Sequence, residues 1–259
     1  MLRVEPIPAF DDNYIWLLRE EGRSDVVLVD PGDADPAIGR LRAEGLALAA
    51  ILITHHHHDH IGGVPDLLAL WPDALVTTPA DQRIAGATRV VGEGDRVSIP
   101  GFQTLFDVIE VPGHTSTHIA YLGDGALFCG DTLFAAGCGR VFDGSFAQLA
   151  ASLRRIGALP PQTLCYCAHE YTLANLGFAA WVEPDSAALA ERTERAGQLR
   201  VAGQPTVPSE LSLELATNPF LRTAESAVVS AAEDFAGTKL ADQTAVFTAL
   251  RQWKDQRYD

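Results

Sequence analysis

The chain has 259 residues, of which 47% are hydrophobic and 20% are charged, and its mean hydropathy is +0.06. These values are typical of a globular protein and exclude a largely disordered chain. The 34 acidic residues outnumber the 19 basic ones and give a formal net charge of −15, so no general nucleic-acid binding is expected. No apolar run reaches the roughly 18 to 20 residues that a membrane span needs, so no membrane association is expected either.

The N-terminus and the cysteines indicate the compartment. The opening segment MLRVEPIPAFDDNY lacks the long apolar core followed by small residues that marks a secretory signal. Four cysteines in a chain of this length do not make a disulfide framework. We therefore expect a reduced, cytoplasmic protein, and the expected oligomeric state is a monomer.

The first two thirds of the chain predict short strands with a few helices between them. Helix starts are indicated where Asp35 and Thr78 each precede a proline, and where Ser145 and Gln148 form a capping box. Strands interleaved with helices favour an α/β layer architecture. The apolar, β-rich runs are Tyr14–Leu18, Val26–Val29, Ala50–Thr54, Leu75–Thr77, Leu105–Val111, His118–Leu122, Ala126–Cys129 and Leu164–Ala168.

The composition changes near Gly177, after which Ala, Leu, Glu and Arg dominate. Helices separated by prolines and by Gly237 are predicted in this part. We therefore predict a catalytic domain over residues 1–172 and a small helical domain over residues 173–259. The predicted helices are Ser186–Val201, Ser209–Ala216, Ala224–Phe235 and Gln243–Gln256.

The most informative segment is Ala50–Gly63, AILITHHHHDHIGG. Its strand ends at Thr54 and delivers five histidines and an aspartate to a sheet edge, where active sites of layered α/β folds commonly lie. An expression tag is a poor explanation because the run is internal, and a solvated polar loop is another alternative. Neighbouring imidazoles are costly unless something neutralises their repulsion. A divalent metal does so, since imidazole and carboxylate are ligands of zinc, iron and manganese.

Three distant segments carry further metal-competent side chains past the ends of predicted strands. They are His114, Asp131 and His169, and each follows an apolar run. A lone histidine is more often structural. Together with the histidine cluster, these positions indicate one shared site.

The order of these residues resembles the signature of the metallo-β-lactamase superfamily. The motif reads Thr54-His55-x-His57-x-Asp59-His60, with His114, Asp131 and His169 after it. The resemblance implies an αββα sandwich in which two metal ions lie between the sheets at one edge. It assigns one ion to His55, His57 and His114, the other to Asp59, His60 and His169, and the bridge between them to Asp131. His56, His58 and His118 would serve packing or support the ligands.

The chemistry agrees with this assignment. Two divalent ions lower the pKa of a shared water from about 15.7 toward roughly 7, and the hydroxide so formed is the nucleophile. Asp59 would be a catalytic residue because it orients this hydroxide. The two ions would stabilise the oxyanion of the tetrahedral intermediate. Zinc is the expected metal, with iron or manganese as alternatives in one or both positions. A structural role for Cys129 and Cys138 is favoured over a nucleophilic or metal-binding one, because no position of the motif requires a cysteine.

Four further segments resemble the glyoxalase II family, the hydroxyacylglutathione hydrolases. They are Phe10-Asp-Asp-Asn-Tyr-Ile-Trp, the loop after Asp131, Glu170-Tyr171, and C-terminal motifs that end in Arg251-Gln-Trp-Lys254. The resemblance covers essentially the whole chain. It implies hydrolysis of S-D-lactoylglutathione to D-lactate and glutathione, the second step of methylglyoxal detoxification. It assigns glutathione binding to Arg140, Phe142, Tyr171, Arg251 and Lys254.

Two of these positions depart from the family pattern. Arg140 stands where lysine is frequent and keeps the charge, with the added ability to bind a carboxylate through two hydrogen bonds. Phe142 stands where tyrosine is common and loses a hydrogen bond worth about 0.5–1.5 kcal/mol. For Arg251 and Lys254, which share a predicted helix face, the alternative is that they are ordinary solvated charges in a last helical turn.

Other activities are alternatives to the thioester hydrolase. One is a persulfide dioxygenase of the same superfamily, which uses one iron; the full ligand set and the helical C-terminal region disfavour it. Another is a lactonase, a β-lactamase or a nuclease, of which the last is disfavoured by the acidic charge. A third is a metal-binding or glutathione-binding module without turnover, which the intact ligand set disfavours.

Overall fold

The computed structural model describes residues 2–258. Over this range the chain forms two compact units. The N-terminal unit comprises the residues up to Glu110 together with Thr117–Gly130, and the C-terminal unit comprises Val111–Ser116 and the residues from Asp131 onward. Among the described residues, no helix is both long enough and apolar enough to cross a membrane. The predicted domain boundary between residues 172 and 173 stays a prediction.

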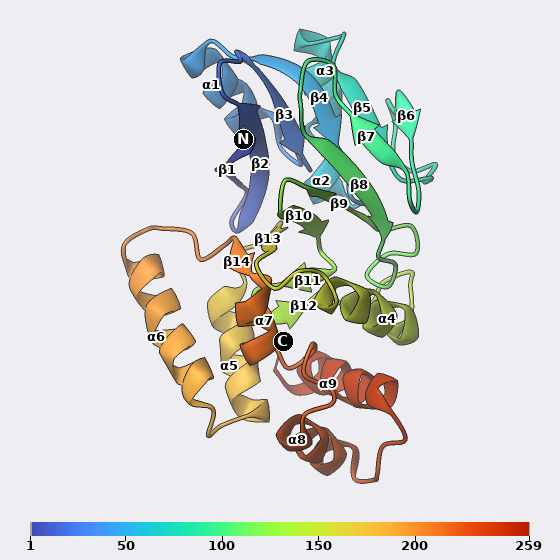
Figure 1. The fold of residues 1–259 in the computed structure, drawn as a ribbon, viewed down its shortest axis with the longest axis vertical. Helices are drawn as coiled ribbons and strands as arrows, with labels where there is room; N and C mark the ends of the chain where they lie inside the picture. The colour runs from blue at the N-terminus through green and yellow to red at the C-terminus, as the bar shows by residue number, and fades with distance from the viewer. Residues whose placement is uncertain (1, 259) are drawn as a thin grey trace. The chain divides into compact units, whose positions relative to one another are not determined.

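The N-terminal unit contains a mixed sheet in the order β1-β2-β3-β4-β5-β6 (Figure 1). The pairs β1–β2 and β2–β3 are antiparallel, whereas β3 to β6 are parallel neighbours. The strands are β1 (Leu2–Ala9), β2 (Asn13–Glu20), β3 (Asp25–Val29), β4 (Ala47–Leu52), β5 (Leu75–Thr78) and β6 (Arg89–Val90).

Helices α1 (Ala34–Glu44) and α3 (Val64–Leu70) share a hydrophobic core with this sheet. Val26 and Leu28 of β3 belong to that core, and Val27 and Val29 of the strand are buried as well. A strand that is buried on both faces has a continuous apolar sequence. The run Val26–Val29 therefore predicts a strand although apolar and polar residues do not alternate in it.

A second sheet in the N-terminal unit is antiparallel, in the order β10-β9-β8-β7. Tyr121 of this sheet donates its hydroxyl to the carbonyls of Ile53 at 2.9 Å and of Thr77 at 3.2 Å, next to the ends of β4 and β5. This buried contact joins the two sheets. The strands are β7 (Arg96–Ser98), β8 (Leu105–Glu110), β9 (Ile119–Gly123) and β10 (Ala126–Gly130).

The C-terminal unit is mainly helical, and the helices predicted after Gly177 lie in it. In Figure 1, α5 and α6 lie side by side, and so do α8 and α9. Its strands form the hairpin β11 (Leu133–Phe134)–β12 (Gly137–Cys138) and the antiparallel pair β13 (Leu164–Cys167)–β14 (Ser209–Glu210). Its helices are α4 (Phe146–Gly157), α5 (Thr172–Val182), α6 (Ala187–Val201), α7 (Leu211–Thr217), α8 (Ser226–Ala236) and α9 (Gln243–Arg257).

Several predicted helix starts are confirmed and others are wrong. Ser145 accepts a hydrogen bond from Gln148 N at 3.2 Å, as the capping box predicts. The cap of α1 is Asp33 rather than Asp35, which donates its backbone N–H to the Asp33 side chain. No helix follows Thr78, whose hydroxyl donates to Pro79 O at 3.0 Å, and the chain continues in turns and irregular backbone as far as β6. Ser209 belongs to β14, so α7 begins two residues later than predicted.

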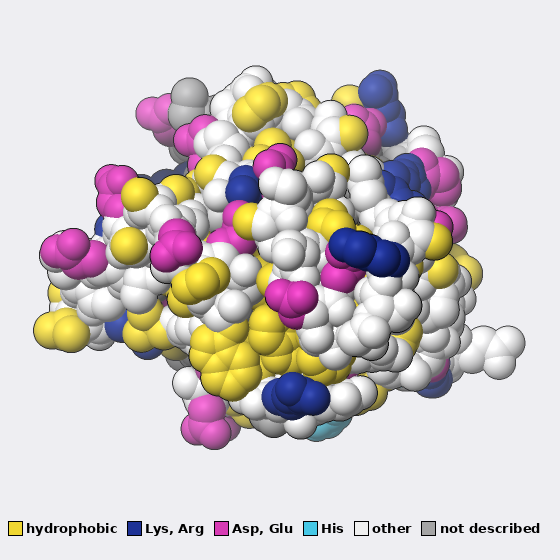
Figure 2. Space-filling model, turned by 90° about the horizontal axis from the view of Figure 1, so that it is seen from below, with side chains coloured by type: hydrophobic (Ala, Val, Ile, Leu, Met, Phe, Trp, Pro, Cys, Tyr) yellow, Lys and Arg dark blue, Asp and Glu magenta, His cyan; other side chains and the backbone are white. Residues whose placement is uncertain are grey.

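A groove lies between α5, α8 and α9 of the C-terminal unit. Trp181, Phe235 and Trp253 line it, and the rings of Phe235 and Trp253 are stacked at 5.5 Å. Figure 2 views the molecule from below relative to Figure 1 and shows apolar side chains gathered on this face. None of the predicted site residues lines this groove, so it is separate from the candidate site.

Candidate metal centre

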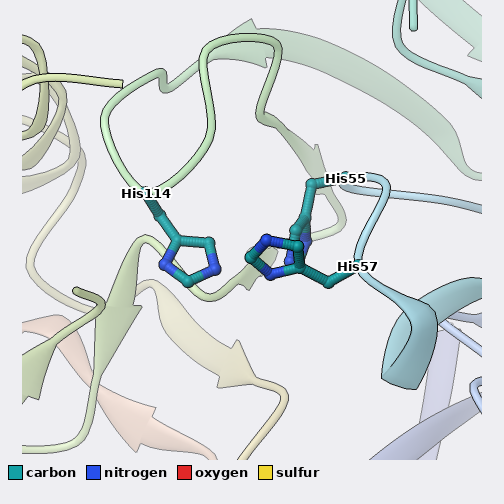
Figure 3. Close-up of side chains that lie close together, drawn as sticks. All are labelled: His55, His57 and His114. Carbon is teal, nitrogen blue, oxygen red and sulfur yellow. The ribbon is translucent and has the colours of Figure 1, made fainter. Parts of the chain in front are cut away.

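The histidine cluster lies on the segment that follows β4. Figure 3 shows His55 and His57 on this segment, and His114 on the loop that follows β8. His55 is fully buried, and its ring centroid lies 4.7 Å from that of His57 and 4.0 Å from that of His60. The short helix α2 (His58–Ile61) follows His57 and turns His60 back toward His55. The ring of His55 also stacks on that of buried His118 at 4.5 Å, which fits the structural role predicted for His118.

Asp30, directly after β3, orients this cluster. Its carboxylate accepts hydrogen bonds from Thr54 N at 2.8 Å and Thr54 Oγ1 at 2.6 Å, and His60 Nδ1 lies 3.0 Å away. A nitrogen that faces a carboxylate carries the proton, so Nε2 of His60 is the nitrogen with the lone pair. The donor atoms of Asp30, His55 and His60 lie within 4.8 Å of one another. Asp30 is not among the residues predicted from the sequence, although it follows an apolar strand just as several predicted ligands do.

Asp59 is held by the opening segment of the chain. Asn13 Nδ2 donates to Asp59 Oδ2 at 3.1 Å, and the same oxygen lies 3.4 Å from His60 Nε2. A side chain on Gly32 would place its Cβ 1.9 Å from the backbone oxygen of Asp59, so only glycine allows this approach. The Asp59 side chain is 40% exposed, so water reaches it.

His114, Asp131 and His169 form a second cluster, within the C-terminal unit. Asp131 Oδ2 lies 3.5 Å from His114 Nε2 and 3.4 Å from His169 Nε2, and all three residues are buried. His114 Nδ1 lies 2.7 Å from the carbonyl oxygen of Arg140, so it donates there and Nε2 keeps the lone pair. A Cβ on Gly139 would meet Asp131 O at 2.1 Å, so this position also requires glycine.

The donors present fit a divalent metal. Both clusters offer imidazole Nε2 atoms and carboxylate oxygens, and in each a histidine is oriented by a hydrogen bond through its other ring nitrogen. These His/Asp clusters are consistent with a binuclear metal site. Such ligands suit zinc, iron and manganese alike, so the donor set does not select among them.

Three of the predicted substrate residues lie beside His114 and His169. The ring of Tyr171 stacks on His169 at 4.7 Å, and Phe142, which is 64% exposed, meets the His114 ring edge-on at 5.2 Å. Arg140 has a half-exposed side chain, and its backbone carbonyl accepts from His114. These side chains are accessible to a ligand next to the second cluster.

Arg251 and Lys254 are buried, so the alternative that they are solvated surface charges is wrong. Arg251 Nη1 donates to the carbonyl oxygen of Cys138 at 3.0 Å, and its Nη2 lies 2.9 Å from Asp255 Oδ1. Lys254 Nζ lies 5.6 Å from the ring centroid of Tyr258. Their assignment to glutathione binding stays a prediction.

All four cysteines are reduced and buried. Burial raises the pKa of the Cys138 thiol to about 11 and that of Cys167 to about 12. A thiol that stays protonated near neutral pH is a poor nucleophile and a poor metal ligand. This supports a structural role for Cys138.

We expect a chromogenic thiol reagent at pH 8 to modify none of the four cysteines of the folded protein, because burial excludes the reagent and keeps the thiols protonated. Titration in denaturant should then find four reactive thiols per chain. A cysteine that reacts rapidly before unfolding would contradict this description.

Comparison with known proteins identifies the family. The model described as Metallo-beta-lactamase superfamily matches residues 9–169, and that described as Hydroxyacylglutathione hydrolase C-terminus matches residues 170–257. A hydroxyacylglutathione hydrolase of Alkalilimnicola ehrlichii is 53% identical over 256 residues, which are 99% of this chain and 100% of the relative.

Solved structures show the same fold. TTHA1623 in a di-iron-bound form aligns with a TM-score of 0.61 and 26% identity, covering 84% of this chain and 100% of that one. ETHE1 from Myxococcus xanthus aligns with a TM-score of 0.58 and 32% identity, covering 66% of this chain and 76% of that one. With a relative 53% identical over its full length and both family models matched in order, the chain belongs to the hydroxyacylglutathione hydrolase family of the metallo-β-lactamase superfamily.

Proposed function

We propose that this protein is a glutathione-thioester hydrolase that converts S-D-lactoylglutathione to D-lactate and glutathione, the second step of methylglyoxal detoxification. The observation that carries this proposal is the match over the whole chain to a hydroxyacylglutathione hydrolase at 53% identity. The His/Asp clusters support it, because they supply the donors that such chemistry needs. A cytoplasmic location and a monomeric state stay predictions.

Two divalent ions would be held by the predicted ligands, with zinc preferred and iron or manganese as alternatives. His55, His57 and His114 would hold one ion, Asp59, His60 and His169 the other, and Asp131 both. When bound, the ions would supply Lewis-acid activation of a water molecule and of the thioester carbonyl. Asp131 suits a role as a ligand of both ions, because one of its carboxylate oxygens lies close to Nε2 of both His114 and His169.

Asp59 is the residue that would orient the attacking water. Asn13 fixes its carboxylate, and the exposed part of its side chain is accessible to solvent. Asp30 keeps the proton of His60 on Nδ1, so that Nε2 would be free of a proton and able to bind a metal. The leaving thiolate comes from a thiol with a pKa of about 8.5, so its departure needs no dedicated acid.

Glutathione binding would use the side chains beside the second cluster. The guanidinium of Arg140 suits a glutathione carboxylate, because it presents two parallel N–H donors. Phe142 and Tyr171 present ring surface beside His114 and His169. Lys254 and Arg251 are also proposed to contact glutathione, although Arg251 now directs its donors to Cys138 O and Asp255.

Arg140→Ala is expected to raise KM about tenfold and to change kcat much less, because it removes a charge-assisted hydrogen bond to a remote part of the substrate. Steady-state kinetics with S-D-lactoylglutathione measure this split. Arg195→Ala, which removes an exposed arginine from α6, is the matched control and should leave KM unchanged. Equal KM values in both variants would remove Arg140 from the binding site.

The function is tested by presenting the purified protein with several substrates. We expect release of free thiol from S-D-lactoylglutathione at a rate far above that for a β-lactam or a lactone. Oxygen consumption with glutathione persulfide, without thioester cleavage, would contradict the proposal and favour a dioxygenase. Binding of metal and glutathione without any turnover would favour a binding module.

A further inference from the structure

The hairpin β11–β12, which lies between Asp131 and Arg140, is held by side chains of the C-terminal helices. Asn175 Nδ2 of α5 donates to the carbonyl of Ala135 at 3.1 Å. Asn218 Nδ2, directly after α7, donates to the carbonyls of Phe134 at 3.2 Å and Gly137 at 2.9 Å. Both asparagine side chains are buried, so these hydrogen bonds are shielded from water.

Glu214 of α7 completes this set of contacts. Its Oε2 accepts from the backbone N–H of Ala136 at 2.8 Å and from Asn218 Nδ2 at 3.2 Å, while its Oε1 pairs with Arg192 of α6. Glu214 is fully buried. Ala136 has φ 56°, a left-handed conformation that a residue with a side chain keeps only when its surroundings enforce it. The Glu214 carboxylate is the group that binds the backbone at this point.

The hairpin in turn supports two predicted site residues through Phe134. The buried Phe134 ring meets the His169 ring edge-on at 5.7 Å and the Tyr171 ring edge-on at 5.2 Å. Displacing the tip of the hairpin therefore removes the surface on which the stacked pair His169–Tyr171 packs.

The base of the hairpin is fixed separately from its tip. Thr132 Oγ1 donates to Val111 O at 3.1 Å, and His114 Nδ1 contacts Arg140 O. Loosening the tip is therefore expected to leave Asp131 in place and to act first on Phe134 and Tyr171.

We infer that Glu214 and Asn218 are positioning residues that place the β11–β12 hairpin, and through Phe134 the Tyr171 side chain, for thioester binding. This inference rests on the proposed function. A buried ion pair such as Arg192–Glu214 adds little to the net free energy of unfolding compared with apolar side chains of similar size. The contacts of Glu214 therefore support a role in holding the β11–β12 hairpin in one conformation.

The test compares Glu214→Gln with Glu183→Gln. Glu183 is a matched control, because it is also a buried carboxylate of the C-terminal unit that pairs with an arginine, Arg222, but it does not contact the hairpin. In Glu214→Gln, either orientation of the amide directs its NH₂ group toward other donors. Both variants should lower Tm. Below Tm, Glu214→Gln should raise KM for S-D-lactoylglutathione about tenfold with kcat changed less than about threefold, and Glu183→Gln should not.

Amide hydrogen exchange gives a readout that does not depend on activity. The Ala136 N–H should exchange faster in Glu214→Gln than in the wild type and in Glu183→Gln. Equal exchange of the Ala136 N–H in the three proteins would overturn the inference. Faster exchange in Glu214→Gln with an unchanged KM would overturn it as well. Wild-type protein that cleaves no thioester would instead contradict the proposed function, while the exchange comparison would still test what holds the hairpin.

Gly137→Ala provides a second variant if Glu214→Gln does not fold. A Cβ at Gly137 would lie 2.4 Å from Asn175 Cγ, so one added methyl group pushes the hairpin away from α5 without removing a buried charge. The same rise in KM is expected, and an unchanged KM in this variant would equally overturn the inference.

Discussion

Asp131→Asn is expected to abolish metal binding and thioester hydrolysis together. One carboxylate oxygen of Asp131 lies within 3.5 Å of Nε2 of both His114 and His169. An asparagine carries no charge and offers one oxygen, so it cannot replace a carboxylate that would contact two cations. Loss of a group that only orients a ligand already costs about 10- to 100-fold, so the loss of a shared ligand should lower kcat/KM by more than about a hundredfold.

Metal analysis of the purified variant, run beside the thioester assay, measures both quantities. Asp234→Asn removes the same charge from an exposed position on α8 and should keep wild-type metal content and rate. Normal turnover in metal-free Asp131→Asn protein would refute the assignment of Asp131.

Asp30→Asn is expected to weaken metal binding about 10- to 100-fold without removing any predicted ligand. The Asp30 carboxylate now keeps the proton of His60 on Nδ1. An amide NH₂ in its place would donate to Nδ1, move the proton to Nε2 and block the atom that would bind a metal. The metal dissociation constant, measured by competition with a chromophoric chelator, reports this change.

Asp33→Asn is the matched control for Asp30→Asn, because it alters a carboxylate of the same segment that caps α1. It should lower Tm slightly and leave the metal dissociation constant unchanged. If Asp30→Asn and Asp33→Asn bind metal equally well, Asp30 does not orient His60 as described.

The sequence predicts the elements that carry the site because each candidate ligand follows an apolar strand. The strands before His55, His114, Asp131 and His169 are all present as β4, β8, β10 and β13. Such strands are buried on one or both faces, so their composition alone marks them. The helix α5 escaped prediction because it is apolar on most of its surface and lacks the period of an amphipathic helix.

Contacts between distant residues could not be predicted in this way. Arg251 looks like a surface charge in its own helix, yet its partner Cys138 O is 113 residues away and lies in a buried hairpin. Glu214 and Ala136 are 78 residues apart, and Asp30 and His60 are 30 apart. A pattern of spacing within one element carries no information on such pairs, so the roles of Asp30 and Glu214 emerged only from the structure.

Thioester hydrolysis is expected to depend on divalent ions held by the His/Asp clusters. The most direct test removes all metal with a chelator, verifies its absence by elemental analysis, and follows S-D-lactoylglutathione hydrolysis as a divalent metal is returned. We expect the metal-free protein to be inactive and the rate to recover as two equivalents bind. Metal-free protein that hydrolyses the thioester at the full rate would contradict the account.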